Sequence, residues 1–252
     1  MSSPYDGVPE GQWRGVTERL VQAHPLTHKI IHDAAMISWQ RLWATRVGDA
    51  ATGFALQGMN PTATLVGTFF EKLFAMELAN QLPGQWRGGN GGGEKDLVCI
   101  NDDSKSVEMK SSGQLGTKIF GNRSYGQAAE NPDSSKKDKS GYYITINFFG
   151  QQITLLRFGW IDASDWKAQR SATGQMAGLP DNVYSSKLLD INGPYQLEAP
   201  IKLLKGVGPK AATELQAHGI RTIGDMVGRG AQDVPVKHAK HWHTAHTMYG
   251  KG

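Results

Sequence analysis

The sequence predicts an α/β protein with a mixed central sheet flanked by helices, followed by a small all-helical C-terminal subdomain. Three observations support this prediction. Apolar residues recur at helical spacing in the first eighty residues, four strand-like runs lie between residues 97 and 160, and helical patterns return after residue 198. We therefore expect a larger α/β domain over residues 1–197 and a smaller helical one over residues 198–252.

The composition narrows the class of protein. The 252 residues are 39% hydrophobic and carry a net charge of +4, which suits a globular chain with a polyanionic partner without identifying one. The one cysteine, Cys99, excludes a disulfide framework and a Cys-rich zinc site, and favours a reducing compartment. With no run of eighteen apolar residues and no N-terminal signal pattern, we expect a cytoplasmic protein that makes no membrane contact.

Two helices are expected before the strands. Residues 1–12 are polar and read as a loose arm, and the apolar spacing of residues 26–43 predicts the first helix. Thr62 or Thr64 can cap a second helix that runs to about Gln81, before the Pro83-Gly84 stop signal. Its expected buried stripe consists of Leu65, Phe69, Leu73 and Met76.

The strand-like runs form two hairpins. Residues 97–100 and 107–110 are joined by a polar turn, and residues 142–149 and 153–160 are joined at Gly150. The polar stretch between the two pairs, residues 114–140, is long for a structureless connection, and such loops are usually functional or mobile.

The first hairpin carries a candidate metal site. Asp96 stands at the start of its first strand, and Glu108 and Lys110 share one face of the second because side chains alternate along a strand. Two carboxylates suit Mg²⁺, the carbonyl of Met109 can add a ligand, and Lys110 can orient or deprotonate a water molecule. A Glu-x-Lys pair alone is more often a solvent-facing ion pair, so the interpretation depends on Asp96 and the hairpin together.

This arrangement resembles the PD-(D/E)xK nuclease superfamily, although Lys95 replaces the proline of its signature. The resemblance implies a glutamate on the preceding helix. The run Gly67-Thr68-Phe69-Phe70-Glu71 supplies Glu71, and Glu77 is the alternative.

Over residues 60–190 the chain looks like type II restriction endonucleases, with Phe158-Gly159-Trp160-Ile161-Asp162 among the runs that carry the likeness. The resemblance implies Mg²⁺-dependent, sequence-specific hydrolysis of phosphodiester bonds in double-stranded DNA. A homodimer acting on a palindrome is the expected geometry, since each strand needs its own cut. The loops after the hairpin would then carry candidate base readers and phosphate contacts, namely Gln114, Asn122, Arg123, Gln127, Lys136 and Lys137.

A second motif lies near the C-terminal end. The run from Lys205 through Gly206 and Gly208 to Lys210 lies between helical patterns and resembles a helix-hairpin-helix motif. Glycines let a backbone approach a phosphate, and the N–H groups of a helix N-terminus donate to it, so the expected DNA contact is independent of base sequence. A plain packing unit or a protein-binding hairpin is the alternative. The His-rich segment that follows is expected to be a basic tail.

Two other functions remain open at this point. A structure-specific nuclease of DNA repair or recombination also combines such a core with helix-hairpin-helix elements. A DNA-binding protein without catalysis would carry the acidic hairpin by chance.

Overall fold

The computed structural model describes residues 3–91, 93–122, 125, 138–168 and 176–250. The chain divides into two compact units. The core unit comprises Met1–Gly113, Lys118–Ile146 and Leu156–Ile191, and the C-terminal unit comprises Gln114–Thr117, Asn147–Leu155 and Asn192–Gly252. Each unit is described by itself.

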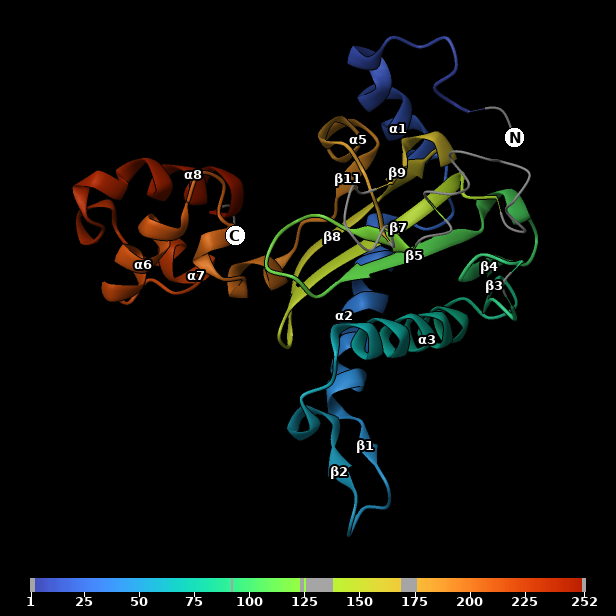
Figure 1. The fold of residues 1–252 in the computed structure, drawn as a ribbon, viewed down its shortest axis with the longest axis horizontal. Coiled ribbons are helices and arrows are strands. Elements are labelled where there is room, and N and C mark those ends of the chain that lie inside the picture. Colours follow the sequence, from blue (N-terminus) through green and yellow to red (C-terminus); the bar gives the residue numbers. More distant parts are fainter. Residues whose placement is uncertain (1–2, 92, 123–124, 126–137, 169–175, 251–252) are drawn as a thin grey trace. The chain divides into compact units, whose positions relative to one another are not determined.

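A six-stranded mixed sheet is the centre of the core unit, as the sequence predicts (Figure 1). Its strand order is β11 (Leu188–Asp190), β8 (Gln152–Ile161), β7 (Gly141–Phe149), β5 (Val107–Ser112), β4 (Leu97–Cys99) and β3 (Trp86–Gly88). The pairs β3–β4, β4–β5 and β8–β11 are antiparallel. The edge strands β3 and β11 escape sequence prediction because each is only three residues long and, unlike β4, neither is joined by a short turn to a second recognisable strand.

A smaller three-stranded sheet has the order β6 (Phe120–Asn122), β10 (Met176–Gly178) and β9 (Lys167–Ala168). Beside it, Ile119, Tyr125, Tyr143 and Trp166 are buried in one hydrophobic cluster. Part of the long polar connection therefore folds against the end of the main sheet.

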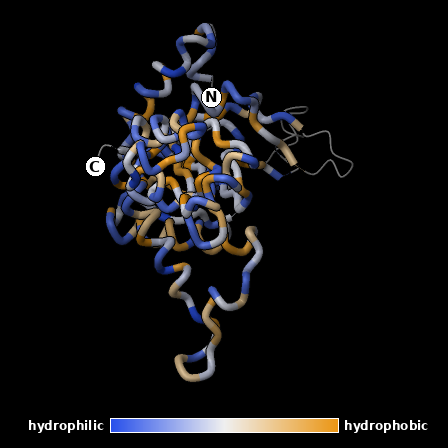
Figure 2. Tube along the Cα trace, turned by 90° about the vertical axis from the view of Figure 1, so that its left-hand side faces the viewer, coloured by the Kyte–Doolittle hydropathy of each residue, from blue (hydrophilic) through white to orange (hydrophobic). Residues whose placement is uncertain are grey.

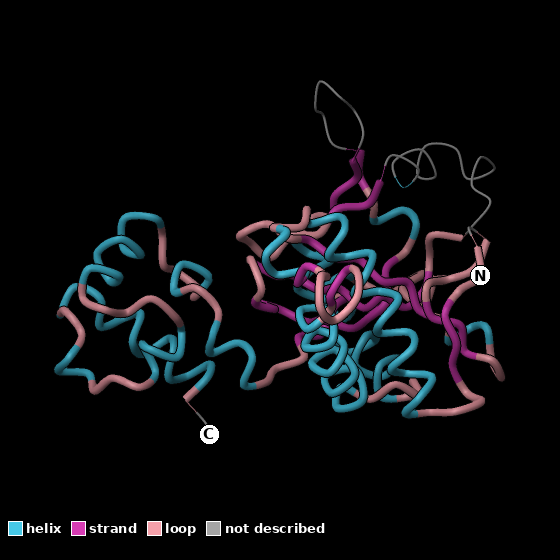
Figure 3. Tube along the Cα trace, turned by 90° about the horizontal axis from the view of Figure 1, so that it is seen from below, coloured by secondary structure: helices cyan, strands magenta, loops and turns pink. Residues whose placement is uncertain are grey.

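Helices α2 (His28–Ala44) and α3 (Ala63–Gln81) begin at threonine caps. Thr27 and Thr62 each accept a hydrogen bond from the backbone N–H three residues later, which confirms the predicted start of the second helix. In the view from below, helices of the core unit lie in front of its strands, so they cover one face of the sheet (Figure 3).

Small residues let α3 pack closely on the sheet. Any side chain at Gly67 would collide with Ser111 in β5, and Ala75 lies against Gly88 in β3. This contact overturns the predicted buried stripe, because the helix turns its Gly67 and Ala75 side inward. Leu65, Phe69 and Met76 are 39%, 38% and 63% exposed. The buried residues are instead Val66, Gly67, Phe70, Phe74, Ala75, Glu77 and Leu78.

The N-terminal segment is not a loose arm over its described part. Tyr5 is buried, and its hydroxyl lies 2.8 Å from that of Thr17 in α1 (Trp13–Gln22). The rings of Tyr5 and Trp13 cover the ammonium of Lys187, with centroids 4.2 and 4.5 Å away. A buried cation thus anchors this segment, and the polar composition of residues 1–12 hides that role.

His24 is a core residue. Its Nδ1 accepts from Leu26 N and its Nε2 lies 3.0 Å from the carbonyl oxygen of Lys105, which fixes the tautomer. Burial lowers the pKa of His24 to about 4. The neutral imidazole therefore ties the start of α2 to the β4–β5 turn.

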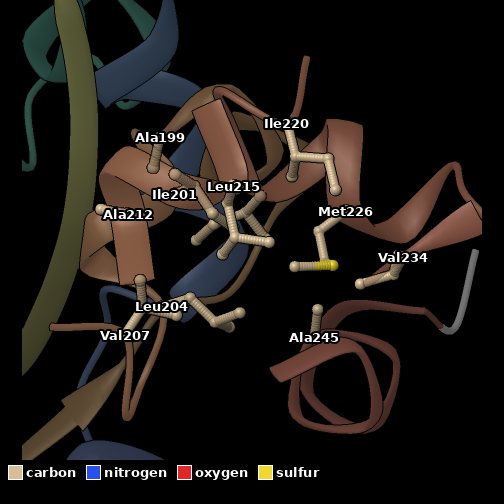
Figure 4. Close-up of a cluster of buried hydrophobic side chains, with 11 residues drawn as sticks. Ala199, Ile201, Leu204, Val207, Ala212, Leu215, Ile220, Met226, Val234 and Ala245 are labelled. Atoms are coloured by element: carbon tan, nitrogen blue, oxygen red, sulfur yellow. The ribbon is translucent and has the colours of Figure 1, made fainter. Parts of the chain in front are cut away.

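The C-terminal unit contains α6 (Pro209–Ala217), α7 (Ile223–Val227) and α8 (Ala239–Tyr249) around its own apolar core (Figure 4). Thr222 and Asp225 form a capping box at the start of α7. The helix expected before the hairpin is only a 3-10 turn over Ile201–Leu203, since Leu204 is already extended. Figure 4 shows Ile201, Leu204 and Leu215 pointing into this core.

The His-rich segment is the third helix of this unit rather than a free tail. His241 Nε2 lies 3.0 Å from the carbonyl oxygen of Gly206, and His238 Nε2 lies 3.0 Å from Glu214. Both imidazoles are buried, so these two residues support the hairpin from inside. Among the helices that the structure describes, none is long and apolar enough to span a bilayer.

Candidate active site

The β4–β5 hairpin brings Asp96 to Glu108. Leu97 pairs with Val107, and continuing that antiparallel register places Asp96 directly across from Glu108. The Asp96 carboxylate accepts a hydrogen bond of 2.7 Å from the backbone N–H of Met109. The acid that precedes β4 is thereby held against the backbone that carries the Glu-x-Lys pair.

Glu108 and Lys110 form an ion pair in which the carboxylate is buried and the lysine is mostly covered. Glu108 is 3% exposed, and Lys110 Nζ lies 2.7 Å from its Oε1. The same ammonium donates to the carbonyl oxygen of Met109 at 2.9 Å. A solvent-facing ion pair would have both groups in water, so the structure disfavours that alternative.

Tyr125 is a site residue that sequence reasoning missed. Its hydroxyl donates to Glu108 Oε1 at 2.6 Å, and its ring lies between two ammonium groups, 5.1 Å from Lys110 Nζ and 4.4 Å from Lys139 Nζ. Burial raises the pKa of Tyr125 far above its ordinary value, which keeps the phenol protonated as a donor. Only a distant tyrosine in a polar loop marks it in the sequence, and no spacing rule links it to Glu108.

The donor atoms suit a hard divalent cation. Asp96 and Glu108 offer carboxylate oxygens, and Met109 offers a carbonyl oxygen between them. Within the described parts of the chain, no group of three or more His, Cys, Asp or Glu residues is placed to hold a metal ion. Zinc usually takes nitrogen and sulfur ligands, whereas Mg²⁺ accepts one or two carboxylates and completes its shell with water and phosphate oxygens.

The two candidate glutamates of α3 differ in their surroundings. Glu77 is buried and engaged, because it pairs with Arg41 and accepts from Gln81 Nε2 at 2.8 Å. Glu71 lies one turn from both Gly67 and Ala75, on the helix row that faces the sheet.

Strand alternation, however, puts Ser111, which contacts that row, on the opposite face of β5 from Glu108 and Lys110. Glu71 instead forms an ion pair of 3.2 Å with its neighbour Lys72. An assisting role for Glu71 therefore stays a prediction.

The expected DNA-contacting loops are partly described. Gln114 is exposed in a bend after β5, and Asn122 is exposed on β6. The other four candidates in this region lie outside the described residues, namely Arg123, Gln127, Lys136 and Lys137.

The hairpin of the C-terminal unit presents the start of α6. Gly206 has φ of +87°, a conformation that favours glycine, and Gly208 is the N-cap residue of α6. Lys205 and Lys210 are exposed on either side, while Val207 is buried between them. Nothing lies within 4 Å of a Cβ built on Gly208, so the backbone there is open to a ligand.

Comparison with known proteins gives two matches. A family model described as ScaI restriction endonuclease matches residues 3–192. The chain is also similar to the type II restriction enzyme ScaI of Streptomyces caespitosus, with 39% identity over 199 residues, which covers 75% of this chain and 85% of that enzyme. No solved structure matches.

Proposed function

The chain belongs to the ScaI restriction endonuclease family, and from that premise we propose how its β4–β5 hairpin cuts DNA. Family membership makes the protein a type II restriction endonuclease, a site-specific deoxyribonuclease. The proposal is Mg²⁺-dependent hydrolysis of phosphodiester bonds in double-stranded DNA, with Asp96, Glu108 and Lys110 as the catalytic residues. The observation that carries it is that Asp96 and Lys110 both bond to the backbone of Met109, while the same Lys110 ammonium also bonds to Glu108.

Each group in this cluster has a distinct task. Asp96, Glu108 and the carbonyl of Met109 would hold the cation, which when bound lowers the pKa of a water ligand and offsets charge on the phosphate. Lys110 orients the attacking water, accepts its proton or stabilises the negative charge that develops on phosphorus-bound oxygen.

Two hydrogen bonds fix the ligands. The N–H of Met109 holds Asp96 and the phenol of Tyr125 holds Glu108, so both carboxylates are oriented before a substrate arrives. We also include Glu71 as a residue that assists metal binding or catalysis, because the PD-(D/E)xK pattern has a glutamate on the helix before the hairpin.

Cleavage of ordinary DNA tests this function. With Mg²⁺, the purified protein is expected to cut linear phage DNA into discrete fragments whose mapped ends share one sequence, and with a chelator it is expected to leave the DNA intact. A structure-specific nuclease would spare plain linear duplex and cut branched substrates. A binding protein without catalysis would retard the DNA on a gel and leave its length unchanged.

Sequence readout is assigned to the polar segments that follow β5. Amide and guanidinium side chains form bidentate hydrogen bonds to base edges, and lysines contact phosphates without reading bases. The exposure of Gln114 and Asn122 fits this role. The proposed readers are Gln114, Asn122, Arg123 and Gln127, and the proposed phosphate contacts there are Lys136 and Lys137.

We assign backbone binding to the hairpin of the C-terminal unit as a helix-hairpin-helix element. The open backbone at Gly208, the N–H groups at the start of α6, and the exposed Lys205 and Lys210 suit a phosphate. His241 bonded to the Gly206 carbonyl holds the turn in its left-handed conformation.

Replacing Lys205 and Lys210 by alanine is expected to weaken DNA binding without changing the sequence that is cut. Each lost phosphate contact should make the slope of log K against the logarithm of the salt concentration less steep by about 0.9. Binding measured between 50 and 200 mM salt, with fragment ends mapped in parallel, checks this. Lys202→Ala, an exposed lysine just before the hairpin, is the control. A changed cleavage sequence in the double variant would contradict the assignment.

A second copy of the chain completes the proposal. Each chain supplies one Asp96–Glu108–Lys110 cluster, and a double-strand break needs two, so a two-fold homodimer on a palindrome is the proposed active species.

A further inference from the structure

Helix α3 is apolar on two opposite faces. One face packs on the sheet through Gly67 and Ala75. At 100° per residue, Leu65, Phe69 and Met76 fall in a narrow row on the reverse side, and all three are exposed. A helix at the surface of a folded unit normally presents polar residues to water, so a second apolar row indicates a partner.

A projecting hairpin carries further exposed apolar residues. β1 (Arg46–Val47) and β2 (Phe54–Ala55) form a two-stranded hairpin beyond the end of α2, on the side of α3 that faces away from the sheet (Figures 1 and 2). Val47 and Phe54 are register partners, so they share one face, and they are 49% and 72% exposed. A two-stranded hairpin is marginally stable by itself, so packing against a partner would stabilise it.

We propose that the outer row of α3 and the β1–β2 hairpin form the dimer interface of this enzyme, and that the occupant is a second copy of the chain. This inference rests on the proposed function, and names the surface that joins the two catalytic clusters.

The row on α3 is self-complementary. Leu65 and Met76 lie equally far from the point between Phe70 and Glu71, so an antiparallel copy related by a two-fold axis at that point places Leu65 against Met76 of the partner subunit. The same axis brings Lys72, whose side chain is 60% exposed, over Phe69 across the interface, where a cation–π contact can form. A two-fold interface needs this kind of pattern, since each contact must occur twice.

The area is of the right order for a stable dimer. The exposed apolar side chains of the row and the hairpin, together with Met59 of the 3-10 turn Leu56–Met59 that lies between them in the chain, are Val47, Phe54, Met59, Leu65, Phe69 and Met76. With about 150–250 Å² for a large side chain, their exposed parts amount to roughly 600 Å². A standard interface buries about 800 Å² per partner, of which a polar rim supplies the remainder.

Disruption of the row tests the surface. Sedimentation equilibrium of the full chain is expected to show a dimer for the wild type and a monomer for Phe69→Lys/Met76→Lys, with the same thermal unfolding profile apart from its concentration dependence. Val236→Lys is the matched control, because Val236 is an apolar residue that is 91% exposed in the C-terminal unit. It is expected to remain a dimer. A dimeric Phe69→Lys/Met76→Lys variant would overturn the proposal.

Cross-linking tests the two-fold geometry directly. The double variant Leu65→Cys/Met76→Cys is expected to form disulfide-linked dimers on mild oxidation, while each single variant stays unlinked, because residues 65 and 76 are about 16 Å apart along one helix. Cys99 is buried and does not compete. Equal cross-linking of the single and double variants would exclude the antiparallel arrangement.

These results separate the interface from the proposed function. A wild-type monomer that cuts DNA at one sequence would overturn the interface and leave the nuclease proposal standing. A dimer with the expected cross-links that leaves DNA intact with Mg²⁺ would do the reverse.

Discussion

Lys110→Ala is expected to lower the rate of DNA cleavage by about 10²–10⁴-fold while duplex binding is retained, since a positioned acid or base contributes factors of that size. The substitution removes the ammonium that lies 2.7 Å from Glu108 and 2.9 Å from the Met109 carbonyl. Single-turnover cleavage of an oligonucleotide duplex measures the rate, and an electrophoretic mobility shift measures binding.

Lys105→Ala is the matched control, because Lys105 lies in the turn at the other end of the same β4–β5 hairpin. It is expected to cut at the wild-type rate. Loss of a buried charge partner can also destabilise the hairpin, so Lys110→Met and the unfolding midpoint of each variant belong in the series. Wild-type cleavage by Lys110→Ala would reject the proposed site.

Tyr125→Phe tests whether Tyr125 acts by positioning Glu108 rather than by taking part in the cleavage step itself. The change deletes only the hydroxyl that donates to Glu108 at 2.6 Å, a bond to a charged group worth about 1.5–3 kcal/mol. We expect roughly a 10- to 100-fold loss, less than for Lys110→Ala, together with a higher Mg²⁺ concentration for half-maximal rate. A purely structural role for Tyr125 would lower stability and leave the Mg²⁺ dependence unchanged.

The hairpin of the site could be derived from the sequence because its signals are local. Asp96, Glu108 and Lys110 fall within fifteen residues, and a turn between two apolar runs fixes their register. Tyr125 could not be found in the same way. Its contact with Glu108 depends on how a polar loop folds against Trp166 and Tyr143, and no periodic pattern encodes that.

Helix α3 shows why an apolar stripe does not by itself identify the buried face. Leu65, Phe69 and Met76 form the more conspicuous row in the sequence, yet the sheet selects the row with Gly67 and Ala75 because small residues allow close approach. If that row were buried, Glu71 would face away from the core, whereas the observed packing puts Glu71 on the side of α3 that faces the sheet. In the C-terminal unit, Gly219 and Thr222 end and begin helices through local backbone geometry, which is the kind of signal that a sequence carries directly.

Lys187→Met is expected to lower the free energy of unfolding by about 3–5 kcal/mol, since it leaves buried carboxylates without a counter-charge. Lys187 is 3% exposed and contacts Asp162 at 2.7 Å and Asp165 at 2.8 Å. Its ammonium also makes cation–π contacts with the rings of Tyr5 and Trp13, so the substitution removes the contact that anchors the N-terminal segment. Urea unfolding at pH 7 measures the loss, and Lys167→Met, an exposed lysine beside Asp165, is the control with an expected change within about 0.5 kcal/mol.

The pH dependence of this loss identifies its cause. Burial raises the pKa of Asp165, and the ammonium of Lys187 opposes that rise, so its removal raises the pKa of Asp165 further. A carboxyl whose folded-state pKa lies above its unfolded value costs stability above the folded pKa, and the cost fades as acid protonates it. The deficit of Lys187→Met should therefore shrink between pH 7 and pH 5. Adding Asp162→Asn and Asp165→Asn should restore much of the stability at pH 7, because no buried charge remains. A deficit that is constant with pH and survives these two changes would show that lost packing, rather than unpaired charge, is responsible.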